Sequence, residues 1–149
     1  WTKIPTQLQY GRVYTVAMPI PYGLVNKLCN SLPRIIIKTA DDHIHAESGD
    51  NLYLEVCDTN DSNTCCKQTF DGGFEVGAEN IFAFNGEFQK CLESSKKLYY
   101  FMGLTGNDGW KSNGIKIYFD GITEEVCTLD GEKWLDGDSR LGPRLPLIC

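Results

Sequence analysis

The sequence lacks the patterns that mark a membrane span, a common enzyme class or a nucleic-acid-binding surface. No apolar run approaches the ~20 residues that a transmembrane helix needs. There is no Gly-x-Ser-x-Gly elbow, no phosphate-binding glycine loop and no His-Glu-x-x-His sequence. Lysine and arginine number 14 against 20 aspartates and glutamates, and the net charge of −6 argues against binding to phosphate backbones. We therefore expect a non-enzymatic chain that does not bind nucleic acid.

Metal-ligand spacings are also missing, although cysteine is abundant. The chain has seven cysteines but no Cys-x-x-Cys pair, and its two histidines are His43 and His45. Two imidazoles on one face of a strand could bind a metal, but no cysteine or carboxylate spacing completes a site. We therefore expect them to be exposed loop residues. Disulfides formed in an oxidising compartment explain the cysteines better.

The cysteine pattern and a glycosylation motif together predict a secreted, extracellular protein. Asn60 begins an Asn-x-Ser sequon in a polar loop, and residues 1–5 resemble a mature end left after cleavage. Adjacent Cys65 and Cys66 should have separate partners, and Cys57 with either of them could close the loop at 58–64. Because seven is odd, at least one thiol is free or bonded to another chain. A thiol bonded to another chain would give a disulfide-linked oligomer, whereas a free thiol is compatible with a non-covalent one.

Short β-rich segments between turn clusters predict an all-β fold without helices. The expected strands are residues 11–18, 34–39, 51–57, 79–84, 97–104, 115–119, 124–129 and 144–149. Leu52 and Leu54 alternate with Tyr53 and Glu55, which predicts one solvated face for that strand. Such a series is typical of an antiparallel β-sandwich of about eight strands, here stabilised by disulfides. We expect residues 34–149 to form the sandwich and residues 1–33 to be an N-terminal extension packed on it.

Three motifs in this region resemble those of PLAT domains, the β-sandwich modules of lipases and lipoxygenases. The first is Phe74-x-x-Gly77 leading into Phe82-x-Phe84, where alternation puts two rings on one face of a strand. The second is a polar glycine-bearing loop before Trp110 with Ile115 and Ile117 after it; Asn113 stands where the family often has aspartate. The third is Cys127 followed by Trp134-Leu135 and the Gly-Asp-Ser-Arg-Leu run at 137–141, with a longer Cys-to-Trp spacing than in the family. The resemblance covers about 115 residues.

The resemblance implies a disulfide and a calcium site. Pancreatic lipases close this module with two cysteines, which correspond here to Cys127 and Cys149. Several PLAT domains bind calcium at loops of one sandwich end, and hard cations need several oxygen ligands. Two loops offer such oxygens, and the resemblance places them near one end: Asp41, Asp42, Glu47, Asp50 and Asn51 in the first, Asn107 and Asp108 in the second. The alternative is that these residues are turn-formers and solvated charge.

Lipid contact is the function that the resemblance implies most directly, beside binding of a protein partner. Trp110 is either an exposed lipid anchor or a cap on the core, and Tyr22 is a second candidate for lipid contact. The acidic charge favours a basic protein partner. We therefore expect a secreted interaction module for a lipid surface or an extracellular protein, assisted by calcium. The alternatives are a small secreted hydrolase with an unrecognised site, and a disulfide-linked subunit of a larger extracellular or toxin-like complex.

Overall fold

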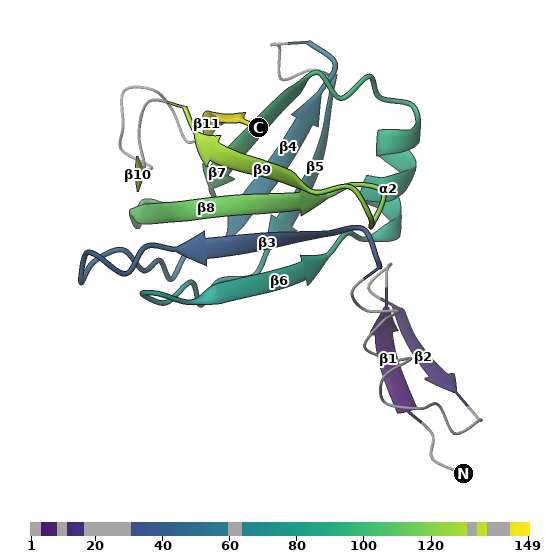
Figure 1. Ribbon diagram of the computed structural model, residues 1–149, viewed down its shortest axis with the longest axis horizontal. Coiled ribbons are helices and arrows are strands. Elements are labelled where there is room, and N and C mark those ends of the chain that lie inside the picture. The colour runs from purple at the N-terminus through teal and green to yellow at the C-terminus, as the bar shows by residue number, and fades with distance from the viewer. Residues whose placement is uncertain (1–3, 9–11, 17–30, 60–63, 131–133, 137–143) are drawn as a thin grey trace.

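The computed structural model describes residues 4–8, 12–16, 31–59, 64–130, 134–136 and 144–149, and they are mostly antiparallel β (Figure 1). The strands are β1 (Ile4–Leu8), β2 (Arg12–Val16), β3 (Arg34–Thr39), β4 (Leu52–Cys57), β5 (Cys65–Phe70), β6 (Glu79–Ala83), β7 (Tyr99–Leu104), β8 (Trp110–Tyr118), β9 (Glu125–Leu129), β10 (Trp134–Leu135) and β11 (Arg144–Ile148). One helix, α2 (Gly86–Glu93), occurs in this described part of the chain.

The main sheet has nine strands and curls into a nearly closed, barrel-like shape. Its order is β5-β4-β7-β11-β9-β8-β3-β6, and β10 pairs with β8 outside this path. The sheet is narrowest at β11, which pairs with β7 through residues 144–146 and with β9 through Leu147 and Ile148 only. Along this path three strands, β5-β4-β7, lie on one side of β11 and four, β9-β8-β3-β6, on the other.

The core fills the inside of this curled sheet. Burial alternates along β3, so that Ile35 and Ile37 are fully buried, and Ile115 and Ile117 of β8 lie opposite them. Phe82 on β6 is partly buried and packs against the same core as Phe84, which directly follows β6 and is fully buried, so the two rings lie on one face as expected. A cluster of aromatic rings fills the end near the helix: Phe70, Phe82, Phe84, Phe88 and Phe119.

The expectation that the chain has no helix is wrong. Asn85 caps α2 by accepting a hydrogen bond from the Phe88 amide at 2.8 Å, and Phe88 and Leu92, four residues apart, are buried on one face. Cys91 ties the helix to Cys66 on β5. A helix of eight residues is too short to show a clear apolar period, so its stability comes from its cap, its disulfide and its buried face.

The expectation that one face of β4 is solvated is wrong. Tyr53 is only 5% exposed, because Gly103 lies opposite it on β7 and leaves room for the ring. A Cβ atom on Gly103 would stand 2.2 Å from the Tyr53 ring. Arg144 lies beside it with its guanidinium carbon 4.0 Å above Phe101, so aromatic and cationic side chains cover this face.

Three disulfides account for six of the seven cysteines: Cys57–Cys65, Cys66–Cys91 and Cys127–Cys149. Cys65 and Cys66 do have separate partners, because neighbouring side chains of a strand point to opposite faces. The bond between Cys127 and Cys149 is the one that the PLAT resemblance implies. The seventh cysteine, Cys29, lies outside the described residues.

The N-terminal strands form a sheet of their own. β1 and β2 pair antiparallel from Ile4 opposite Val16 to Leu8 opposite Arg12, and neither joins the main sheet (Figure 1). β2 falls within the strand expected at 11–18, whereas β1 was not expected. That residues 1–33 pack on the main sheet stays a prediction.

Candidate functional site

Three loops and β10 meet at one end of the main sheet, which we call the loop end. The loops are residues 40–51, 71–78 and 105–109. Backbone hydrogen bonds join them: the Gly77 amide donates to the Ala40 carbonyl at 3.1 Å, and the Ser48 amide donates to the Phe74 carbonyl at 3.0 Å. Gly77 has φ +73°, so a glycine fits this turn better than other residues. The loop end therefore gathers the segments that carry the predicted acidic residues.

Asp50 and Asp108 are brought together, as expected, but they hold the loops to each other. The Gly49 amide donates to Asp108 Oδ2 at 2.8 Å, and the Asp108 amide donates to Asp50 Oδ2 at 2.7 Å. A Cβ atom on Gly106 would lie 2.4 Å from the Asp50 carboxylate, so only glycine lets the loop pass this close. Both carboxylates thus act as acceptors for backbone amides that would otherwise lack a partner.

The other proposed calcium ligands do not converge into a cage in this arrangement. Asp42 pairs with the Lys111 ammonium at 2.8 Å, and Asn51 accepts a hydrogen bond from the Gly72 amide at 2.7 Å. Asp41, Glu47 and Asn107 are exposed. Among the described residues, the one group of at least three acidic, histidine or cysteine side chains with converging ligand atoms is Glu55 with Cys57 and Cys65. The loop-end carboxylates therefore do not fit a preformed site of the kind that calcium requires.

Trp110 is part of the core, so the alternative of an exposed lipid anchor is wrong. Its side chain is 0% exposed, and its Nε1 donates to Thr39 Oγ1 at 2.9 Å. Its ring packs edge-on against Phe74 at a centroid distance of 6.5 Å. A buried indole needs a partner for its N–H, and Thr39 supplies it. Tyr22 and Asn60, the other predicted lipid-contact and glycosylation residues, lie outside the described residues.

The loop end instead exposes an aliphatic residue, Ile44, of whose side chain 78% is accessible. It stands between His43 and His45, which lie in a turn rather than a strand. The His43 ring contacts the half-exposed Trp134 edge-on at 5.1 Å. The Lys111 ammonium lies 5.7 Å from the same indole ring. The sequence signal for this site was Ile44, an aliphatic residue between polar ones in a predicted loop. From the sequence we considered only the two histidines beside it, as possible metal ligands.

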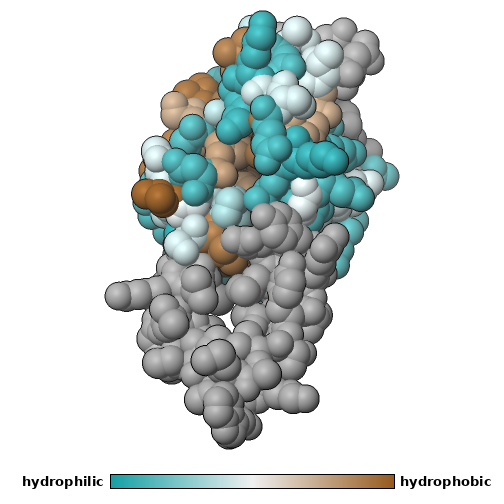
Figure 2. Space-filling view, turned by 90° about the vertical axis from the view of Figure 1, so that its right-hand side faces the viewer, coloured by the Kyte–Doolittle hydropathy of each residue, from teal (hydrophilic) through white to brown (hydrophobic). Residues whose placement is uncertain are grey.

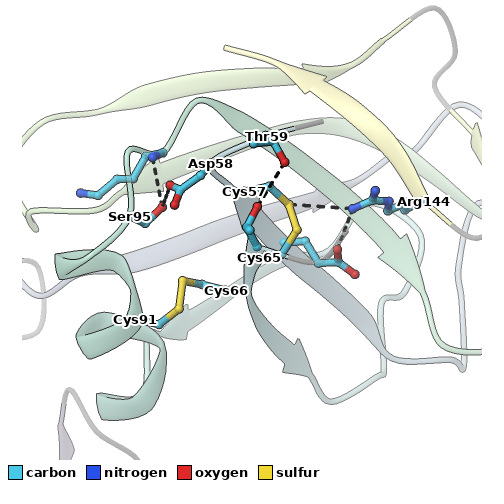
Figure 3. The surroundings of a disulfide bond; sticks show 11 residues. Cys57, Asp58, Thr59, Cys65, Cys66, Cys91, Ser95 and Arg144 are labelled. Carbon is cyan, nitrogen blue, oxygen red and sulfur yellow. Dashed lines mark hydrogen bonds and ion pairs between the residues drawn. A yellow bond between two sulfur atoms is a disulfide. The ribbon is translucent and has the colours of Figure 1, made fainter. Parts of the chain in front are cut away.

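The residues around the Cys57–Cys65 disulfide hold neighbouring segments together and do not form a metal site (Figure 3). Arg144 Nη1 lies 2.7 Å from Glu55 Oε2 and 3.9 Å from Cys57 Sγ. On the other side Asp58 accepts from the Ser95 hydroxyl and the Lys96 amide, and these bonds lower the pKa of Asp58. Both sulfur atoms are in the disulfide and Glu55 is paired, so no ligand atom remains for a cation.

No protein-family model matches the chain, and no curated protein matches its sequence. Within the described residues, no helix has the length and apolar character that crossing a membrane requires. Figure 2 shows the right-hand side of Figure 1, where apolar residues lie as separate groups among hydrophilic ones. The geometry of the loop end is therefore the main guide to function.

Proposed function

We propose that this chain is a secreted, non-enzymatic binding module, a PLAT-like sandwich that docks on lipid surfaces with its loop end. The observation that carries the proposal is the exposure of Ile44 at the loop end, beside the half-exposed Trp134. Aliphatic residues gain free energy on leaving water, and tryptophan favours the boundary between water and lipid. Two further features support the PLAT-like part: the mostly antiparallel β fold, and the Cys127–Cys149 disulfide.

The charge of the loop end defines the kind of surface. Asp41, Glu47 and Asp108 are exposed there, and the whole chain carries a net charge of −6. Such a surface is repelled by anionic headgroups at ordinary salt, within a screening length of roughly 8 Å. Zwitterionic lipid is therefore the expected target. Calcium would matter by bridging exposed carboxylates to anionic headgroups, since these residues form no cage.

Vesicle sedimentation tests this proposal. We expect the protein to pellet with phosphatidylcholine vesicles without calcium, and to pellet with phosphatidylserine-containing vesicles only when calcium is present. Ile44→Ser should weaken binding roughly tenfold, because about 1.5 kcal/mol of apolar transfer is lost. Ile122→Ser is the matched control, since Ile122 is 82% exposed but lies in the β8–β9 turn at the other end of the sheet.

Two results would contradict lipid docking. Absence of pelleting with every vesicle would exclude it and shift attention to a basic protein partner. Equal losses in Ile44→Ser and Ile122→Ser would show that binding does not use the loop end.

A further inference from the structure

The main sheet opens beside β11, and the opening forms a cleft. β7 begins at Tyr99, but its pairing with β11 reaches only from Gly103 to Phe101. β9 begins at Glu125, but its pairing with β11 covers only Thr128 and Leu129. The first residues of β7 and β9 are therefore not paired with β11, whose last residues line the space beside them. The space they leave, here called the seam cleft, has a volume of about 470 Å³ and is lined among others by Lys97, Leu98, Tyr99, Tyr100, Glu125 and Leu147.

The seam cleft contains the Glu125 carboxylate, which forms no ion pair within the part of the chain that the structure describes. Glu125 lies on the same face of β9 as the buried Cys127, and its Oε2 atom is buried with no hydrogen-bond partner among the described residues. The nearby Tyr100 cannot supply a positive charge. Burial first, then the charge of the Glu125 carboxylate and a hydrogen bond to that carboxylate, raise the pKa of Tyr100 to about 12, so the phenol stays protonated at neutral pH.

Lys97 is the basic residue in the cleft lining, and the ion pairs of the described residues include none between a basic side chain and Glu125. The Lys97 ammonium lies 5.4 Å from the Phe119 ring centroid, and Lys116 Nζ lies 3.6 Å from Glu124 Oε1. Arg144 is paired with Glu55 at 2.7 Å. A buried carboxylate oxygen without a partner costs free energy, and that cost is removed when a cation meets it.

The remaining wall suits an apolar stem next to that cation. Leu98 is 63% exposed and Tyr99 is 42% exposed at the cleft, and Leu147 is buried at its inner side. Aromatic rings also attract organic cations. The cleft volume falls within the roughly 300–1,000 Å³ of small-molecule sites.

We propose that the seam cleft binds a small organic cation, a primary amine on an apolar stem, with the ammonium against Glu125. The stem lies along Tyr99 and Leu147. The site is distinct from the loop end, because β7 runs from Tyr99 in the cleft to Leu104, whose end leads into the loop at 105–109. The proposal therefore does not depend on lipid docking.

The test is a titration of the full ¹⁵N-labelled chain followed by amide chemical shifts at neutral pH. The probe is 4-phenylbutylamine, and 4-phenylbutan-1-ol is its uncharged counterpart of nearly equal shape. We expect the amine to shift the amides of Tyr100, Glu125 and Leu147. The amine should bind roughly tenfold tighter than the alcohol, because only its ammonium can donate a charge-assisted hydrogen bond to the Glu125 carboxylate.

Glu125→Gln keeps the side-chain shape and removes the charge, so it should weaken amine binding roughly tenfold and leave alcohol binding unchanged. Glu124→Gln is the matched control, because the neighbouring Glu124 carboxylate accepts from the Tyr118 hydroxyl at 2.8 Å outside the cleft. The proposal is overturned if the amine does not bind, if amine and alcohol bind the wild-type chain equally, or if Glu125→Gln binds the amine as well as wild type. The comparison of the two probes needs no variant, so it stands even if a variant does not fold.

Discussion

The curled sheet has two places where neighbouring strands do not form a backbone ladder, and they are closed in different ways. At the first, between the edge strands β5 and β6, the Gln68 side chain takes the place of a strand. Its amide donates to the Ala83 carbonyl at 3.1 Å and its oxygen accepts from the Asn85 amide at 2.9 Å. At the second, where β11 pairs with β7 and with β9 over only part of each strand, the seam cleft remains, and Glu125 Oε2 has no hydrogen-bond partner among the described residues.

The difference shows what closing a barrel requires. At the β5–β6 seam Gln68 satisfies the Ala83 carbonyl and the Asn85 amide, although Asn80 Oδ1 on β6 is buried with no partner among the described residues. The apolar side of this seam is filled by rings such as Phe70 and Phe82, 5.0 Å apart. Helix α2 is tied beside it by the Cys66–Cys91 disulfide. The β7–β9 opening has a disulfide too, Cys127–Cys149, but no side chain that replaces the missing ladder. We infer that the β5–β6 seam stabilises the fold, whereas the seam cleft beside β11 has room for a ligand.

Removing each disulfide compares the two seams most strongly. The cysteines are 25 residues apart in Cys66–Cys91 and 22 apart in Cys127–Cys149, so the loop-entropy model assigns about 3 kcal/mol to either bond. The Cys66→Ser, Cys91→Ser pair should nevertheless lower the free energy of unfolding more than the Cys127→Ser, Cys149→Ser pair, because it also releases α2. Urea unfolding of both double variants measures the difference. Equal losses would show that α2 adds nothing to the closure.

A smaller effect is expected from the Gln68 side chain alone. Gln68→Met removes both of its hydrogen bonds but keeps the length of the side chain, and should lower the free energy of unfolding by about 2 kcal/mol. Gln68→Glu is the matched variant: it can still accept from the Asn85 amide but cannot donate to Ala83. Hydrogen exchange should therefore quicken at Asn85 in the methionine variant only. An unchanged exchange rate at the Asn85 amide in Gln68→Met would show that the Gln68 side chain does not close the gap between β5 and β6.

The sequence was informative where alternation and turn residues act locally. The strand at 34–39 matches β3 throughout, and the expected loops between the strands contain the acidic segments of the loop end. The pairing of Cys127 with Cys149 followed from the resemblance alone. Periodicity could not reveal β5, because Cys65, Cys66, Lys67 and Gln68 show no apolar alternation, and pairing with β4 makes this segment a strand.

The site was harder to predict than the fold, because its residues act through long-range contacts. Asp50 and Asp108 are 58 positions apart, and only the structure shows that each accepts a backbone amide of the other's loop. Trp110 after a polar loop has the pattern of an exposed anchor, but the Thr39 hydroxyl on β3 allows its indole to be buried. The seam cleft has no sequence signal, since it results from the short pairing of β11 with β9.

The smallest expected effect concerns Tyr100, and it tests whether Tyr100 and Glu125 are neighbours in solution. The pKa of Tyr100 rises from 10.0 to about 12 on folding, so between these pH values the unfolded chain loses the phenolic proton and the folded chain keeps it. Stability is therefore fully present below pH 10 and falls as the pH rises towards 12.

In Tyr100→Phe this part of the alkaline loss of stability should disappear, although the raised pKa of Tyr53 leaves another part. Tyr99→Phe, next to it on β7 and 42% exposed, is the matched control for removal of a phenolic hydroxyl. Glu125→Gln should reduce the loss only partly, because burial is the larger cause of the shift and the carboxylate the smaller one. Unfolding by urea on both sides of this pH range measures all four chains. An identical alkaline loss in wild type and Tyr100→Phe would mean that Tyr100 is solvated in the folded chain, and the cleft would then lack the buried surroundings that leave Glu125 in need of a cation.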